Sequence, residues 1–148
     1  MQSTVPRAKA ALLALLEART WDNGKPKVKW GGPTESEDFP KGGEIIYFGD
    51  TAINDTNQTL GATRYDETYN IRVVIDVKLD GDHEQRAETR AWDLYGEVIV
   101  LLDANRTLGD VLSRMTDRTV RQTNIPMPQG WLARVVVDQG CVGLMFNP

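Results

Sequence analysis

Residues 65–77 read YDETYNIRVVIDV, and this stretch decides the fold. Its side chains alternate with a period of two, which is typical of a half-buried strand. The apolar positions share one face: Tyr65, Tyr69, Ile71, Val73, Ile75 and Val77. Only Glu67 and Val74 break the alternation. A strand of this length with one apolar face belongs to an antiparallel or mixed sheet that is covered on one side, so we expect helices to cover it.

A long amphipathic helix is predicted directly after this strand. Residues 79–81 form a turn, Asp82 is the expected N-cap, and Gln85 completes a capping box. Apolar residues then recur at helical spacing up to an end near residues 103–105: Ala87, Ala91, Leu94, Tyr95, Val98, Ile99 and Leu102. This stripe supplies one of the covering helices.

The N-terminal third predicts a second helix and two strands. Thr4 is the expected N-cap of a helix that runs to about Arg19. Lysines alternate with apolar residues over 25–30, which predicts an edge strand protected by charge rather than a basic, aromatic nucleic-acid patch. Residues 31–43 are expected to form a surface loop, and the apolar run 44–48 a buried strand.

The stretch from Thr51 to Thr63 is polar and has no period, so it predicts a long loop. Long loops in small domains often carry function, and a binding protein would be expected to use this one. In the C-terminal third, residues 115–125 and 131–137 predict two strands joined by a proline loop. Residues 141–146 predict a further short strand, since Gly140 and Gly143 interrupt the pattern.

These elements predict a single α/β (α+β) domain over residues 1–148. It contains one mixed, mainly antiparallel sheet with two helices packed on one face. The net charge of −4, from 17 basic and 21 acidic residues, argues against a protein that binds the nucleic-acid backbone in general. No signal peptide or membrane-spanning stretch is recognisable, and a single cysteine is compatible with a reducing compartment.

The sequence indicates no catalytic residue, metal-ligand set or cofactor site. His83 is the only histidine, and we expect it to be exposed in the first turn of the long helix. The acidic residues around it lack the glycine and glutamate that a calcium loop requires. Cys141 has no basic neighbour in sequence and is expected to be a small buried hydrophobe. The neighbouring carboxylates Asp66 and Glu67 are expected to be solvated.

The order of elements carries a resemblance over nearly the whole chain. A helix and a short strand precede IIYFGD at 45–50, a polar loop, RYDETYNIRVVIDV at 64–77, a long helix, TLG at 107–109 and further strands. This layout resembles the tail-terminator and tail-completion proteins of long-tailed bacteriophages, whether siphovirus-like or myovirus-like. Relatives read Leu-Gly-Gly after the long helix, where this chain has Leu108-Gly109-Asp110.

The resemblance implies a structural virion protein that needs no cofactor. About six copies would form a ring on the tail tube, end tube polymerisation and dock the head connector, by closed cyclic assembly. The implied partners are other copies of the chain, the major tail tube protein and the head-tail connector protein, and DNA would pass through without specific binding. The protein would be assembled in the host cytoplasm and would lie at the head-proximal end of the tail.

Under this interpretation, residues in the polar stretch and two arginines are expected to form the subunit or tube interface: Thr51, Asn54, Asp55, Asn57, Gln58, Arg118 and Arg121. Three alternatives stay open. They are another head-tail joining protein of the neck or connector, a small ligand-binding regulatory module, and an enzyme completed at a subunit interface.

Overall fold

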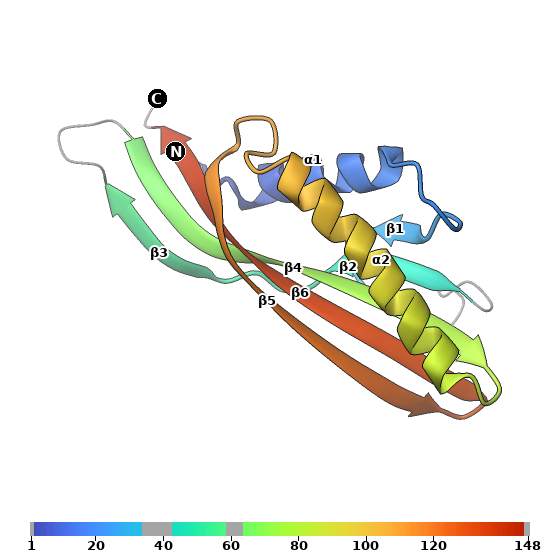
Figure 1. Ribbon diagram of the computed structural model, residues 1–148. Helices are drawn as coiled ribbons and strands as arrows, with labels where there is room; N and C mark the ends of the chain where they lie inside the picture. The colour runs from blue at the N-terminus through green and yellow to red at the C-terminus, as the bar shows by residue number, and fades with distance from the viewer. Residues whose placement is uncertain (1, 34–42, 59–63, 147–148) are drawn as a thin grey trace.

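Two helices cover one face of a long, twisted sheet in the computed structural model of the protein (Figure 1). The structure describes residues 2–33, 43–58 and 64–146, and the side chains of 55–58, 64 and 146 are outside the description. The elements follow one another as α1 (Val5–Ala18), β1 (Lys27–Lys29), β2 (Glu44–Phe48), β3 (Ile53–Gln58), β4 (Arg64–Asp80), α2 (Glu84–Ala104), β5 (Leu112–Met127) and β6 (Gly130–Phe146). The predicted α+β class with a single, mainly antiparallel sheet is confirmed.

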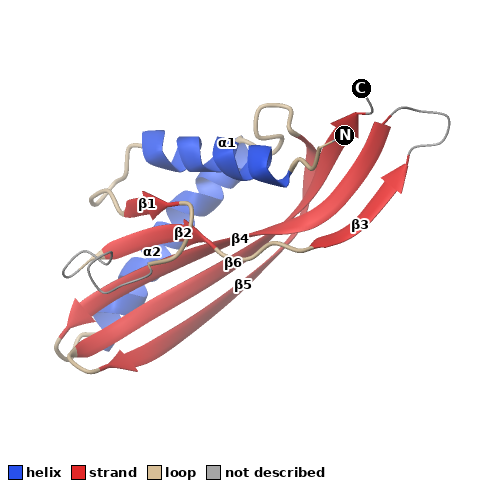
Figure 2. Ribbon diagram, turned by 180° about the vertical axis from the view of Figure 1, so that it is seen from behind, coloured by secondary structure: helices blue, strands red, loops and turns tan. Residues whose placement is uncertain are grey.

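Across the described residues the six strands form one sheet in the order β1-β2-β4-β6-β5, and β3 pairs with the remaining length of β4. All pairings are antiparallel except the one between β1 and β2. β4 therefore has β6 along one side and, on its other side, β2 at one end and β3 at the other. Seen from behind, β3 extends along β4 beyond the part of the sheet that the helices cover (Figure 2).

The core lies between the helices and the covered face of β4 and β6. The apolar positions predicted from the alternation face the helices, and Ile71, Val73 and Ile75 are almost completely buried. They meet Leu12 and Leu16 of α1 and the apolar stripe of α2. Burying an aliphatic side chain of this size contributes about 1.5–3 kcal/mol, so the alternation in β4 is the main determinant of the fold.

Glu67 is buried, and the expectation that it is solvated is wrong. It lies on the covered face below the start of α1, where its Oε1 accepts hydrogen bonds from Thr4 N and Thr4 Oγ1, both at 2.9 Å, and from Ser3 Oγ at 3.1 Å. Thr4 is the N-cap residue, as predicted, but its hydroxyl bonds the sheet and makes no cap bond within the helix. A carboxylate near a helix N-terminus is favoured by the helix dipole. The interruption of the alternation at residue 67 therefore marks the anchor of α1.

α2 begins one residue later than predicted. The N-cap is His83 rather than Asp82, and it makes no side-chain cap hydrogen bond, so the predicted capping box with Gln85 is wrong. The turn before it is made by Gly81, whose φ of +86° is accessible to glycine without strain. The predicted apolar stripe faces the sheet, and Glu97 joins it as a buried polar residue that accepts a hydrogen bond from Asp22 N at 3.0 Å.

The C-terminal third is one long hairpin. β6 is continuous from residue 130 to 146, so the separate short strand predicted at 141–146 is wrong. The two glycines that suggested a break allow close approaches instead. A Cβ on Gly140 would lie 2.1 Å from Thr116 Oγ1, and one on Gly143 would lie 1.9 Å from Thr4 Oγ1. Both glycines are therefore required by packing within an unbroken strand.

The polar stretch that follows Phe48 is not the long loop predicted for 51–63. Residues 53–58 form β3, which pairs with Tyr65 to Tyr69 of β4, while residues 59–63 are outside the description. The strand was missed because its sequence, INDTNQ, has a single apolar residue and hence no alternation. Likewise, residues 34–42 of the predicted surface loop are outside the described residues.

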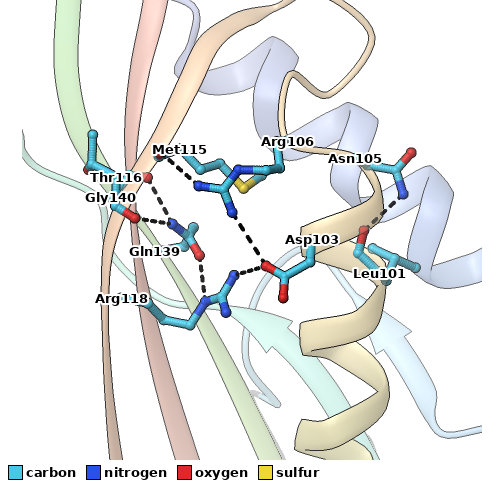
Figure 3. A network of polar contacts seen from close by, with 9 residues as sticks. All are labelled: Leu101, Asp103, Asn105, Arg106, Met115, Thr116, Arg118, Gln139 and Gly140. Atoms are coloured by element: carbon cyan, nitrogen blue, oxygen red, sulfur yellow. Dashed lines mark hydrogen bonds and ion pairs between the residues drawn. The ribbon is translucent and has the colours of Figure 1, made fainter.

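A polar network joins the C-terminal end of α2 to β5 and β6 (Figure 3). Arg118 donates to Gln139 Oε1 at 2.6 Å and to Asp103 Oδ1 at 2.9 Å. The buried amide of Gln139 donates in turn to the carbonyl oxygens of Thr116 and Gly140. These contacts span a register shift in β5 between Met115 and Arg118, so the network holds the bulged strand against the helix.

Candidate functional site

Both sides of the sheet end in strands with an open edge. β5 forms one end of the strand order, and β3 lies on the opposite side of the sheet, beyond β4. Within the described residues, no strand pairs with the outer edge of either one. An open edge presents a row of backbone N–H and C=O groups that can pair with another chain. β5 and β3 therefore offer pairing edges that face away from each other, and the short β1 forms the other end of the strand order, on the same side of the sheet as β3.

The connection from β2 to β3 forms a shoulder, which we define as residues Gly49 to Asn54. β2 ends opposite Val73 of β4, and β3 begins opposite Tyr69, so the connection runs beside the residues between them. Gly49 N donates to the carbonyl oxygen of Arg72 at 2.9 Å, and a Cβ on Gly49 would lie only 2.7 Å from Arg72 Cδ. Glycine thus lets the chain cross the stem of Arg72 closely.

A polar hollow of about 290 Å³ lies at this shoulder on the face of the sheet that the helices leave uncovered. We call it the shoulder hollow, and its walls are Asp50, Thr51, Ala52, Asn54, Asn70, Arg72 and Asp138. Arg72 and Asp138 are cross-strand neighbours whose side chains pair at 2.8 Å and 3.1 Å. This pairing raises the pKa of the Arg72 guanidinium, with a smaller contribution from Asp50.

One atom of the shoulder hollow is unsatisfied. Thr51 Oγ1 is buried and has no hydrogen-bond partner in the part of the chain that the structure describes. Buried polar atoms are almost always hydrogen-bonded, so such an atom calls for a physical reason. Beside it, Ile53 is 48% exposed at the start of the open edge of β3. The register between β3 and β4 shifts at Asn54, which is therefore a bulged residue at the same edge.

The open edge of β5 is polar and basic. Its exposed side chains are Arg114, Thr116, Asp117, Thr119, Arg121, Thr123 and Pro126. Arg121 stands opposite Val136 of β6, and Thr119 stands opposite Asp138. Since opposite residues share a face, Arg121 projects from the same uncovered face that bears the shoulder hollow.

The predicted interface residues therefore divide into groups. Thr51 and Asn54 lie together in the wall of the shoulder hollow, and Arg121 lies on the same face at the opposite edge. Arg118 lies on the helix-covered face and is engaged by Asp103 and Gln139. The remaining three, Asp55, Asn57 and Gln58, are part of the β3 backbone, and their side chains are outside the description.

The other residues of the hollow were missed as site residues. Asn70 and Arg72 are among the polar positions of the alternation in β4, and this pattern could have placed both side chains on the uncovered face. Asp138 joins them only through the register of β4 with β6, which a single sequence does not give.

The uncovered face also contains a buried ion pair. Asp76 is 1% exposed and accepts hydrogen bonds from Arg134 and from the hydroxyl of Tyr47. Burial, followed by the charge of Asp76, raises the pKa of Tyr47 to about 12. The charged groups in the middle of this face are thus neutralised by their own neighbours, in contrast to the exposed Arg121 at its edge.

His83 and Cys141 were the remaining candidates for chemistry in the sequence. His83 is exposed at the start of α2, and Cys141 is fully buried, with burial raising the pKa of its thiol to about 12. Among the residues described, no three His, Cys, Asp or Glu side chains gather where they could hold a metal ion. Neither described helix combines the length and apolar character needed to cross a membrane.

Comparisons with the known protein families and with curated proteins find no match for this chain. A functional interpretation therefore depends on the layout of the elements and on the two open edges.

Proposed function

We propose that this chain is a structural virion protein of a long-tailed bacteriophage, a tail terminator that forms a ring on the end of the tail tube. The ring ends tube polymerisation and provides the surface on which the head connector docks. Its partners are further copies of the chain, the major tail tube protein and the connector protein, and DNA passes through the ring without specific binding. The protein lies in the virion at the head-proximal end of the tail after assembly in the host cytoplasm.

The observation that carries this proposal is the pair of open strand edges on opposite sides of one sheet. A contact between two different surfaces of the same chain is heterologous, and it generates a ring when the rotation between copies closes. Antiparallel strand pairing across such a contact provides backbone hydrogen bonds, which contribute about 0.5–1.5 kcal/mol each. The helices lie on one face and obstruct neither edge (Figure 1).

A structural role also agrees with the state of the ionisable side chains. The buried carboxylates Glu67 and Asp76 are bonded to the protein's own donors. The Cys141 thiol is protonated at neutral pH because its pKa is raised. An activated nucleophile would require the opposite shift, toward a lower pKa.

The experiment is to purify the chain, concentrate it and examine it by native mass spectrometry and electron microscopy, alone and with tail tubes of the same phage. We expect rings of about six copies, and tubes capped at one end that no longer lengthen when tube protein is added. If only monomers are seen, even beside tubes, the proposal is wrong. Rings that bind a head connector but leave tubes free to grow would favour the alternative of a neck or connector protein.

A further inference from the structure

We propose that the shoulder hollow is a socket for the Arg121 side chain of a second copy of this chain. This inference rests on the ring proposed above and names the contact that joins one copy to the next. It assigns a role to a hollow, to an exposed arginine and to a hydroxyl that has no hydrogen-bond partner among the described residues.

The chemistry of the hollow suits a guanidinium group. Its walls carry two carboxylates, Asp50 and Asp138, against the single cation Arg72. Amide and hydroxyl oxygens of the remaining polar residues add further acceptors, including Thr51 Oγ1, which has no partner among the described residues. A guanidinium offers five N–H donors and no acceptor, so it can satisfy several of these oxygens at once. Asp50 also interacts electrostatically with Lys9 of α1, but Lys9 is not part of the wall of the hollow.

The geometry brings Arg121 to the correct face. Strand addition of one copy's β5 beside another copy's β3 extends the sheet, with the helices of both copies on the same side. Arg121 then projects from the uncovered face, where the hollow opens, because it shares that face with Val136 and Asp138 of β6. A slip of two residues in the pairing would keep the side chain on this face, and a long side chain reaches diagonal neighbours about 7–8 Å away.

A second copy is a better occupant than an unrelated partner because both halves of the contact are on this chain. The acceptor-rich hollow adjoins the open edge of β3, and the exposed arginine belongs to the open edge of β5. Arg118, the other arginine expected at the interface, is held by Asp103 and Gln139 on the covered face. Arg121 is therefore the arginine of the pair that is available to a neighbour.

The test is a charge exchange between the two halves of the contact. Arg121→Glu and Asp50→Arg each place like charges in the contact, and we expect each to lower the fraction of chain in rings by about tenfold or more in native mass spectrometry. An equimolar mixture of the two variants should restore rings, because every junction is again complementary when the variants alternate around the ring. Both side chains are exposed, so the urea unfolding midpoint of each monomer should stay close to that of the unchanged protein.

Arg86→Glu is the matched control, since Arg86 is an exposed arginine on α2 and undergoes the same change of charge. It should leave ring formation unchanged. If the unchanged protein forms rings and the two test variants do so equally well, the socket is wrong and the ring stands. Loss of rings without rescue in the mixture, or an equal loss with Arg86→Glu, also overturns the socket. A protein that forms no rings at all overturns the proposed function and the socket with it.

Discussion

Asp76 and Arg134 stand directly opposite each other in β4 and β6, and the guanidinium donates to both carboxylate oxygens, at 2.8 Å and 3.0 Å. The carboxylate side chain is 1% exposed, whereas that of Arg134 is 36% exposed. Tyr47 completes the group by donating to Asp76 Oδ2 at 3.0 Å. A buried carboxylate with three donors thus lies on a face of the sheet that carries no helix, and it ties β2 to β4 and β6.

Asp76→Ala should destabilise the protein strongly. The change leaves Arg134 and the Tyr47 hydroxyl without their acceptor in a half-buried site, and removing one partner of a buried pair costs about 3 kcal/mol. Urea unfolding followed by circular dichroism measures the difference. The matched control is Asp138→Ala, which breaks the more exposed pair with Arg72, where the side chains are 40% and 17% exposed. That variant should lose less than about 1 kcal/mol, and equal losses would contradict the distinction.

Stability should decline on the alkaline side because three groups, Cys141, Tyr47 and Tyr69, bind their protons more tightly in the folded state. Burial raises the pKa of Cys141 from 9.0 to about 12 and that of Tyr47 from 10.0 to about 12, and it raises the pKa of Tyr69 further still. A raised folded-state pKa contributes stability that is complete below the unfolded value and is lost as the pH rises toward the folded one. The free energy of unfolding should therefore fall from about pH 9 upward.

Cys141→Ala and Tyr47→Phe isolate the contributions of the thiol and of Tyr47, and Tyr69 accounts for part of the decline that remains. The first variant should flatten the decline that begins near pH 9, and the second should make the decline that begins near pH 10 less steep, when urea unfolding is repeated at several pH values. The native thiol should also react with a thiol reagent only after unfolding. Rapid reaction of the folded protein at pH 8 would contradict the assigned burial of the thiol.

Glu67→Ala should loosen the start of α1. The change leaves Thr4 N, Thr4 Oγ1 and Ser3 Oγ without the acceptor they share, and unsatisfied buried donors cost about 1–3 kcal/mol. Limited proteolysis should then cleave near the N-terminus sooner than in the unchanged protein. Glu67→Gln keeps a carbonyl acceptor of the same shape and should lose distinctly less stability. Similar behaviour of the two variants would show that the hydrogen bonds to residue 67 do not hold the helix.

The sequence predicted those elements of the fold whose apolar residues recur at a regular spacing and are also the residues that are buried. Residues 65–77 and the stripe of α2 belong to this class, because each buries one regular face. β3 was missed because it is paired through its backbone and has hardly any apolar side chains to reveal a period. Gly140 and Gly143 led to the wrong prediction of a separate short strand. In sequence, a glycine that permits a close approach cannot be distinguished from one that interrupts a strand.

The candidate site was predictable only in part, for a related reason. The polar stretch after Phe48 correctly drew attention to Thr51 and Asn54, which line the shoulder hollow. Asp138 follows Asn54 by 84 residues in the sequence, and it reaches the hollow through strand register alone. Arg118 and Arg121 are three residues apart in a regular part of β5 and therefore lie on opposite faces, but which of them faces the helices depends on the bulge before Arg118 and on the register with β6. Register and bulges arise from pairing between distant segments, and local sequence does not contain them.

Amide hydrogen exchange tests directly whether the open edges are used in assembly. In an isolated antiparallel edge strand, alternate residues bond their neighbour through the backbone and the residues between them point outward. For the monomer we therefore expect slow and fast exchange to alternate along residues 119–125 of β5. If copies join by strand pairing, the amides of β5 that exchange fast in the monomer should exchange slowly in the ring. The amides of β3 that point away from β4 should also become slow. Two-dimensional NMR spectra of exchanging samples measure both states, and the amides of β4 at residues 65–69 and 73–77 serve as an internal control because these residues are paired on both sides. Rings in which the outward amides of β5 and β3 exchange as fast as in the monomer would show that another surface joins the copies.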